Sequence, residues 1–251
     1  MKIYFASDFH LGIPDYDSSL VREKLIVKWL DEIKEDASEI YLLGDLFDFW
    51  FEYRTVVPRG FVRLLGKIAE ITDAGTPVHI FTGNHDMWMF DYLPQELNVT
   101  LNREHVTREY NGVKFFIGHG DGIGPGDHGY KFIKAVFANK ICQWLFARIH
   151  PNLAFALANF WSGRSRVATE QLQFLGEENE YQIIFAKDKL KTEHIDYFIF
   201  GHRHIPNDIE LSDSSRYINL GDWIDNFTYA VFDGDNLELK SYKDSSAGAA
   251  E

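Results

Sequence analysis

The chain has 251 residues, 45% of them hydrophobic, and a formal net charge of −13 at pH 7. This length and composition suit one substantial domain with a decorating subdomain and exclude a chain that is disordered throughout. The acidic balance argues against a nucleic-acid-binding protein, because a polyanion is usually met by a clustered basic face.

Cys142 is the only cysteine, so no disulfide forms within the chain, and a reducing cytoplasm is compatible with that. No run reaches the roughly 18 uninterrupted apolar residues that a membrane-spanning helix needs. The N-terminal run becomes strand-like at once and meets Asp8, so we expect no secretory signal peptide. We therefore expect a soluble or peripherally membrane-attached protein. Residues 245–251 are small and polar, which predicts a flexible tail.

Strand and helix signals alternate along the first hundred residues. Apolar runs at Lys2–Ser7, Ile40–Leu43 and Val78–Thr82 predict strands, and the helix-periodic stretches Ser18–Asp36 and Gly60–Ala74 separate them. This alternation predicts βαβ units and a parallel sheet with helices on its faces. In such sheets the active residues gather beyond the carboxyl ends of the strands.

Beyond Leu101 the pattern predicts antiparallel pairing. His105–Tyr110 and Val113–Gly118 flank Asn111-Gly112, a dipeptide favoured in tight hairpin turns. Further strands are predicted at Ile195–Phe200, Arg216–Leu220, Thr228–Asp233 and Leu237–Tyr242. We therefore predict an α/β protein whose core is a two-layered β-sandwich flanked by helices.

The segment 129–169 differs from the rest of the chain. It is aromatic-rich and helix-like, and it contains six lysines and arginines but no Asp or Glu. We predict that it forms an inserted helical cap between two core segments, 1–128 and 170–244.

Polar residues with metal-binding chemistry stand directly after predicted strands. Asp8-x-His10 and His202-x-His204 each place two such side chains two residues apart, and in extended backbone these project to one face, where they can chelate an ion. Asp45 follows Gly44, which permits the close turn that pushes the next side chain into a cleft. A turn or helix-capping aspartate would look the same.

Two further segments centre on Asn84 and His119. Gly83-Asn84-His85-Asp86 sets an amide beside an imidazole and a carboxylate, and Gly118-His119-Gly120-Asp121 sets an imidazole between two glycines. Polar turns are the alternative interpretation of both.

In their order along the chain, these five segments resemble the calcineurin-like metallophosphoesterase superfamily, whose motifs read DxH, GD, GNH[DE], GH and GHxH. The resemblance implies a two-metal site, with Asp8, His10 and His204 on one ion, Asn84, His119 and His202 on the other, and Asp45 bridging both. Oxygen and nitrogen ligands without thiolate suit Mn²⁺, Fe or Zn²⁺, and we expect Mn²⁺. Such a pair of ions acidifies a water and clamps phosphoryl oxygens.

His85 is not a ligand in that pattern. Its position suits the donation of a proton or a hydrogen bond to the phosphoryl or leaving oxygen. We expect Asp86 beside it to orient the imidazole and to hold it protonated.

A more specific resemblance, over nearly the whole chain, is to the UDP-2,3-diacylglucosamine pyrophosphatases of lipid A synthesis. Five segments match that family: Asp8–Leu11, Gly44–Trp50, His119–Asp121 together with Asp127–Tyr130, His202 with its neighbours at 201–206, and Leu220-Gly221. The resemblance implies cleavage to UMP and 2,3-diacylglucosamine 1-phosphate in the cytoplasm at the inner membrane. It places substrate contacts at Asn84, His85, Asp127, Arg164 and Arg166. The well-studied branch has Arg where this chain has His85, so another nucleotide or phospholipid stays an alternative.

A lipid-linked substrate needs an apolar groove, and the predicted cap offers apolar residues at helical spacing, from Phe132 to Trp161. The alternative is a helical hairpin that packs a core stripe against the main domain. An acid-free, basic and apolar segment also suits an anionic membrane surface, and we expect peripheral attachment through the cap. We expect no obligate protein partner. A further alternative is a catalytically silent interaction protein, although such proteins typically lose metal ligands.

Overall fold

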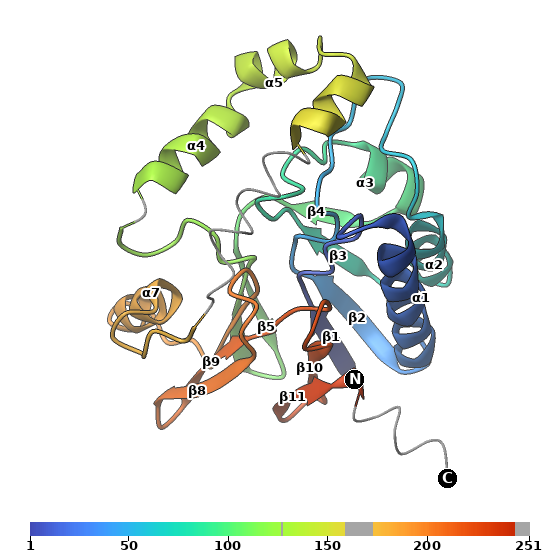
Figure 1. Cartoon of the computed structure of the whole chain (residues 1–251). Helices are drawn as coiled ribbons and strands as arrows, with labels where there is room; N and C mark the ends of the chain where they lie inside the picture. The colour runs from blue at the N-terminus through green and yellow to red at the C-terminus, as the bar shows by residue number, and fades with distance from the viewer. Residues whose placement is uncertain (127, 159–172, 244–251) are drawn as a thin grey trace.

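The computed structural model describes residues 1–126, 128–158 and 173–243, and two β-sheets stacked face to face form its centre (Figure 1). The six-stranded sheet has the order β11-β10-β1-β2-β3-β4, and the five-stranded sheet has the order β5-β6-β7-β9-β8. Helices α1, α2 and α3 lie on the outer side of the first sheet, and α7 covers the second. The predicted two-layered sandwich flanked by helices is therefore confirmed.

The first sheet combines the predicted parallel strands with the closing hairpin. Its strands are β1 (Lys2–Ala6), β2 (Ala37–Leu42), β3 (Val78–Phe81), β4 (Thr100–Asn102), β10 (Thr228–Phe232) and β11 (Leu237–Ser241). Strands β1 to β4 are parallel, and β10 pairs antiparallel with β1. The carboxyl ends of β1, β2 and β3 therefore meet at one edge of the sheet.

The predicted hairpins β5–β6 and β10–β11 are confirmed, but the second sheet is mixed, so antiparallel pairing does not extend throughout the region beyond Leu101. Its strands are β5 (Val106–Tyr110), β6 (Val113–Ile117), β7 (Tyr197–Phe200), β8 (Asn207–Ser212) and β9 (Ser215–Asn219). The pairs β6–β7 and β7–β9 are parallel. The connection from β6 to β7 contains the cap segment and α7, which is long enough for a parallel crossover.

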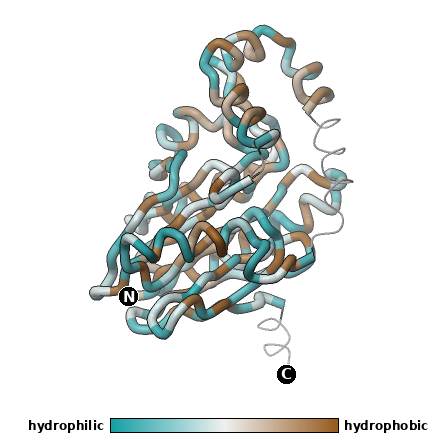
Figure 2. The backbone as a smooth tube through the Cα atoms, turned by 90° about the vertical axis from the view of Figure 1, so that its left-hand side faces the viewer, coloured by the Kyte–Doolittle hydropathy of each residue, from teal (hydrophilic) through white to brown (hydrophobic). Residues whose placement is uncertain are grey.

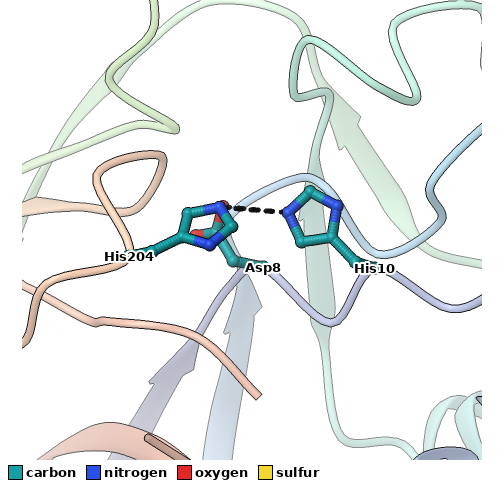
Figure 3. Close-up of side chains that lie close together, drawn as sticks. All are labelled: Asp8, His10 and His204. Atoms are coloured by element: carbon teal, nitrogen blue, oxygen red, sulfur yellow. Dashed lines mark hydrogen bonds and ion pairs between the residues drawn. The ribbon is translucent and has the colours of Figure 1, made fainter. Parts of the chain in front are cut away.

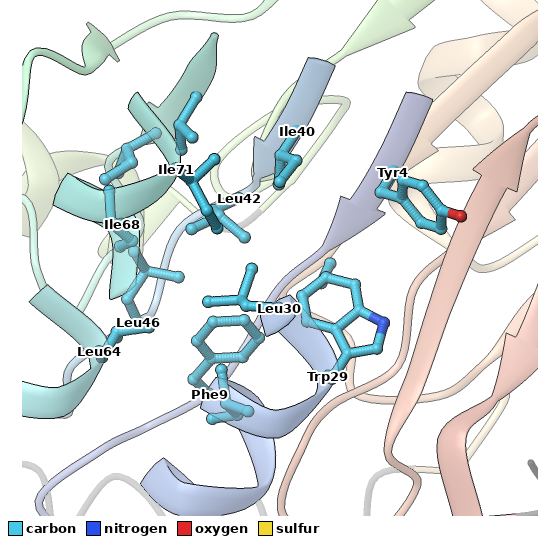
Figure 4. Close-up of a cluster of buried hydrophobic side chains, with 14 of the residues drawn as sticks. Tyr4, Phe9, Trp29, Leu30, Ile40, Leu42, Leu46, Leu64, Ile68 and Ile71 are labelled. Atoms are coloured by element: carbon cyan, nitrogen blue, oxygen red, sulfur yellow. The ribbon is translucent and has the colours of Figure 1, made fainter. Parts of the chain in front are cut away.

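Strict alternation of side chains along β1 builds two separate cores. Ile3 and Phe5 point into the space between the sheets, whereas Tyr4 and Ala6 point toward the helices. The helices over this outer face are α1 (Tyr16–Ile33), α2 (Val62–Asp73) and α3 (Tyr92–Leu97). Figure 4 shows side chains of α1 and α2 packed against those of the sheet.

A third apolar cluster lies between the second sheet and α7 (Tyr181–Leu190). Ile183 and Ala186 of the helix are fully buried, as are Phe198 and Phe200 of β7. The helix thereby fixes the strand whose carboxyl end leads to His202 and His204.

The segment predicted as a cap contains α4 (His128–Ala138), α5 (Lys140–Phe146) and a further helix at 151–158. These helices stand above the carboxyl edge of the first sheet, and apolar stretches recur along them (Figure 2). Aromatic contacts join them to the core, with ring centroids 4.7 Å apart for Trp88 and Phe146 and 5.0 Å apart for Phe49 and Phe155. Among the described residues, no helix is both long and apolar enough to cross a bilayer.

Candidate metal centre and adjoining cavity

All five predicted motif segments meet at one end of the sandwich. Asp8, Asp45 and Asn84 follow β1, β2 and β3, while His119 follows β6 and the His202–His204 loop follows β7. Backbone hydrogen bonds tie the loops together, including Asp8 N to Gly44 O at 3.0 Å. The pairing of parallel strands therefore brings Asp8 and His204, almost two hundred positions apart, to one site.

Five of the candidate ligands have a left-handed backbone. The φ angle is 57° at Asp8, 43° at His10, 52° at Asp45, 69° at His202 and 54° at His204. Non-glycine residues rarely adopt this region, and such strain concentrates at functional sites. The extended backbone predicted for the two paired motifs is therefore wrong, although Asp8 and His10 do lie together. The two histidines of the other motif fall in separate groups.

The first group comprises Asp8, His10 and His204, whose polar atoms point toward one another (Figure 3). The two imidazole Nε2 atoms are 3.1 Å apart, and Asp8 Oδ1 lies 3.2 Å from that of His204 and 3.7 Å from that of His10. Asp8 Oδ1 is buried and accepts no well-directed hydrogen bond from the described residues. A shared cation satisfies all three atoms, so these residues fit a metal ion.

The second group comprises Asp45, His119 and His202. His119 Nε2 is 3.4 Å from Asp45 Oδ2 and 3.2 Å from Asn84 Oδ1. Asp45 Oδ2 is also 3.8 Å from His10 Nε2 of the first group. This carboxylate therefore lies between the two groups, and Asn84 lies beside the second.

The outward nitrogens of three imidazoles face oxygen atoms, and that of His119 makes a hydrogen bond. His119 Nδ1 donates to the carbonyl oxygen of Leu43 at 2.6 Å, which leaves Nε2 as the inward lone pair. His204 Nδ1 lies 3.5 Å from Asp222 Oδ2, and His10 Nδ1 lies 3.6 Å from Asp48 Oδ1. Metal-binding histidines typically have such outer partners, which fix the ring and its tautomer.

The electrostatics of the site also suit cations. Burial opposes ionisation of Asp8, but the imidazoles of His204 and His10 outweigh it and hold its pKa well below the usual value. Burial, reinforced by His119, lowers the pKa of His202 to about 4. Burial opposes protonation of His119 and His204 as well, but Asp45 raises the pKa of His119 and Asp8 that of His204, each to about 10, so these two imidazoles carry protons that a divalent metal would displace.

Asp86 has a different role from the one predicted. Its carboxylate is fully buried and accepts backbone N–H groups, from Gly83 at 2.7 Å and Leu46 at 2.8 Å. It therefore joins two motif loops instead of orienting His85. Burial lowers the pKa of His85, so the expectation of a stably protonated ring is not supported either.

Asp48 is the residue that positions His85. The His85 Nδ1 donates to the carbonyl oxygen of Asp48 at 3.0 Å, and Asp48 Oδ1 lies 3.6 Å from the same nitrogen. His85 Nε2 is thereby the nitrogen available to a ligand. The carboxylate of Asp48 also faces His10, so one buried side chain supports both imidazoles.

The buried side chain of Gln182, which the sequence analysis did not single out, hydrogen-bonds to two of the motif loops. Gln182 of α7 donates from Nε2 to the carbonyl oxygens of Gly120 and Gly201, both at 3.1 Å. Its Oε1 accepts from Tyr217 and Asn219. Both loops that carry second-group histidines thus rest on one side chain.

An apolar cavity of about 620 Å³ opens beside the site. Asp48, Asn84 and His85 line its polar end. Its apolar walls include Trp88, Ile133, Val136, Phe137, Leu145, Phe146, Ile149 and Leu157. Most of these come from the cap helices, so the cap encloses a space continuous with the candidate metal centre. The predicted substrate contacts Asp127, Arg164 and Arg166 lie outside the described residues, as do Phe160, Trp161 and the predicted tail at 245–251.

Close packing of two loops gives the first prediction. A Cβ added at Gly83 would stand 2.1 Å from Asp45 Oδ1 and 2.6 Å from Asp45 N. Gly83→Ala is therefore expected to displace Asp45 and to lower the metal content and the melting temperature. Gly66→Ala is the matched control, because its Cβ meets nothing within 4 Å in helix α2. That exchange should stabilise the fold by about 0.5–1 kcal/mol. Unchanged metal content in Gly83→Ala would contradict this packing.

Imidazoles, carboxylates and an amide from five loops at strand ends, arranged on either side of Asp45, form a ligand set that suits a pair of divalent metal ions. The chain belongs to the calcineurin-like phosphoesterase family, whose model matches residues 1–206, and it is a hydrolase.

Its similarity to two curated relatives extends over nearly its whole length. It is 41% identical over 257 residues to UDP-2,3-diacylglucosamine hydrolase from Porphyromonas gingivalis, covering 97% of this chain and 98% of the relative. It is 25% identical over 239 residues to UDP-2,3-diacylglucosamine hydrolase from Shewanella pealeana, covering 95% and 97%.

Proposed function

We propose that this protein hydrolyses the pyrophosphate bond of UDP-2,3-diacylglucosamine, releasing UMP and 2,3-diacylglucosamine 1-phosphate. The observation that carries the proposal is the continuity between the candidate metal centre and the apolar cavity, with His85 at their junction. A substrate with a diphosphate at one end and acyl chains at the other fits both. The names of the two relatives support the same substrate.

Seven residues hold the ions in this proposal. Asp8, His10 and His204 would hold one, Asn84, His119 and His202 would hold the other, and Asp45 lies where it could contribute to both. Two divalent ions supply the acidification of a water and the neutralisation of phosphoryl charge. Mn²⁺ is the expected metal, with Fe or Zn²⁺ as the other candidates for this oxygen and nitrogen set.

Protein side chains supply the proton donor and bind the substrate. Asp48 holds Nδ1–H of His85, so Nε2 is the nitrogen left for the substrate, and it would give a proton or hydrogen bond to the phosphoryl or leaving oxygen in the imidazolium form, which the negative charge of a bound diphosphate favours. Asn84 and His85 line the cavity and contact the substrate there. The apolar walls exclude water from the acyl chains. By binding the lipid end, they place the diphosphate at the candidate metal centre. We keep Asp127, Arg164 and Arg166 as proposed substrate contacts.

The domain division follows from this assignment. Residues 1–128 and 170–244 form the catalytic core, 129–169 form the cap that encloses the acyl chains, and 245–251 form a tail. The cap contributes most of the apolar cavity wall but none of the seven proposed metal ligands.

Substrate comparison tests the proposal. With Mn²⁺-loaded protein, kcat/KM for UDP-2,3-diacylglucosamine should exceed that for the deacylated UDP-sugar by at least about a hundredfold, because burial of apolar chains contributes several kcal/mol. Equal efficiencies would support a phosphodiesterase for another, soluble nucleotide. Failure to hydrolyse even a chromogenic phosphodiester would support a catalytically silent interaction protein.

The outer surface of the cap supports attachment to a membrane on its cytoplasmic side. Phe132, Ile141, Trp144 and Leu153 are each more than half exposed, in a segment without acidic residues. Such a surface suits an anionic bilayer, where each nearby Lys or Arg contributes about 1 kcal/mol. The substrate's acyl chains would then enter from the bilayer.

Liposome flotation gives the second prediction. The protein should float with vesicles that contain anionic lipid and should remain below them with neutral vesicles. The double variant Ile141→Ser with Trp144→Ser should lose flotation, while Val21→Ser, at an exposed apolar residue of α1, should not. If the unaltered protein floats with neither kind of vesicle, this attachment is excluded.

A further inference from the structure

Lys134 is the only lysine or arginine among the described residues that line the apolar cavity. It lies on α4, on the same cavity wall as Ile133 and Phe137 and in a cavity shared with Asn84 and His85. An ammonium group in such a setting is costly unless a partner stabilises it. Its position therefore needs an explanation beyond ordinary surface charge.

The partner is Asp121, which follows the metal-site histidine His119 by two residues. Lys134 Nζ lies 2.7 Å from Asp121 Oδ2 and 3.3 Å from the Asp121 carbonyl oxygen. Tyr130 of the same helix also donates its hydroxyl to Asp121 Oδ2. Asp121 is buried, and burial is outweighed by His119 and Lys134, which hold its pKa below the usual value.

These contacts hold the ammonium group against the loop that carries His119. The Tyr130 ring is 6.2 Å from that of His202, centroid to centroid, so the α4 side chains reach the metal-site loops. Asp121 accepts two of the three N–H donors that a lysine offers. Within the described part of the chain no other residue accepts from this ammonium group, so a third donor is left for a ligand in the cavity, and the Lys134 side chain is 37% exposed.

We propose that Lys134 is a substrate-binding residue that contacts the phosphate remaining on the lipid product. This inference rests on the proposed function, because it requires acyl chains in the cavity to bring a phosphate to the junction. A lysine that Asp121 holds in place loses little conformational freedom when it binds a phosphate oxygen. Lys134 thereby favours ligands that carry both a phosphate and apolar chains.

A purely structural role is the competing explanation, in which the Lys134–Asp121 pair only anchors the cap. The two explanations differ in what Lys134→Met does, since methionine keeps much of the apolar stem and removes the charge. Loss of an anchor lowers the melting temperature and turnover of every substrate. Loss of a phosphate contact raises KM for acylated substrate alone.

The test compares Lys134→Met with Lys131→Met in Mn²⁺-loaded protein. Lys131 lies one turn earlier on α4, donates to the Gly124 carbonyl oxygen and does not line the cavity. For UDP-2,3-diacylglucosamine, Lys134→Met should raise KM about tenfold with kcat changed less than about twofold. Lys131→Met should match the unaltered protein, and neither should change hydrolysis of a chromogenic phosphodiester.

A second measurement keeps this inference separate from the proposed substrate. Dihexanoyl phosphatidate, a chain-bearing phosphate, should inhibit phosphodiester hydrolysis, and Lys134→Met should weaken that inhibition about tenfold. Lys134→Arg should restore it. No turnover of the acylated UDP-sugar by the unaltered protein would overturn the proposed function alone. Equal inhibition of Lys134→Met and the unaltered protein, or equal loss with all substrates, would overturn the role of Lys134.

Discussion

Asp45→Asn is expected to reduce turnover by at least about 10³-fold, because the loss of two-metal catalysis removes several kcal/mol of transition-state stabilisation. Asp45 is the carboxylate between the two ligand groups, 3.4 Å from His119 Nε2 and 3.8 Å from His10 Nε2. Asparagine retains the oxygen that accepts the His85 N–H at 2.8 Å, so the loop connection is preserved. The change therefore removes charge with little change of shape.

Metal content distinguishes this loss from misfolding. We expect elemental analysis to find about two Mn²⁺ per chain in the unaltered protein and fewer than one in Asp45→Asn. Asp31→Asn is the control, since that exposed carboxylate of α1 pairs only with surface lysines in the described structure. It should retain both ions and full activity. Two ions retained in Asp45→Asn would contradict the bridging role.

His85→Ala is expected to retain both ions and to lose about 10²- to 10⁴-fold in kcat, the usual contribution of a positioned proton donor. The imidazole touches the substrate end of the cavity and is held by the Asp48 carbonyl oxygen at 3.0 Å. His85 belongs to neither the group that contains Asp8 nor the group that contains Asp45, but it does form a third close group with His10 and Asp48. We therefore expect His85→Ala to lower kcat without lowering the metal content.

His79→Ala is the matched control for that variant. The two imidazoles are similarly enclosed, with side chains 14% exposed for His79 and 16% for His85, but His79 contacts Glu39 of β2, away from the site. Its replacement should leave kcat unchanged. Loss of metal from His85→Ala in proportion to its loss of activity would instead make His85 a ligand.

Much of the site could be predicted from the sequence because each motif is local. A short apolar strand, a glycine and a polar residue stand together at Gly44-Asp45 and Gly83-Asn84, and the structure shows why glycine is needed there. The extended geometry assumed for Asp8 and His10 failed, because left-handed backbone is set by contacts between loops and has no strong local signal in non-glycine residues.

The supporting residues could not be predicted in the same way. Gln182, Asp222 and Asp48 act on histidines or loops that are distant in the sequence, so only the fold brings them together. Asp48 did lie within the resembling 44–50 motif, which was a usable signal. Asp86 was assigned by adjacency to His85, whereas its carboxylate faces the backbone of the neighbouring loop.

The elements of the fold also differ in how well the sequence predicts them. Strands β1, β2 and β3 carry strong apolar runs and were predicted, but the edge strand β8 has an alternating half-exposed pattern that resembles a loop in isolation. The parallel pairing of β6 with β7 depends on a connection of some eighty residues, and hairpin signals say nothing about it.

Identification of the products most directly tests the proposal that the protein hydrolyses the pyrophosphate bond of UDP-2,3-diacylglucosamine. Purified, Mn²⁺-loaded protein would be incubated with UDP-2,3-diacylglucosamine, and the products would be identified by mass spectrometry, with a chelator-treated sample in parallel. We expect UMP and 2,3-diacylglucosamine 1-phosphate in equal amounts, with neither formed after metal removal. Release of UDP, or no cleavage by a sample that hydrolyses a chromogenic phosphodiester, would contradict the account.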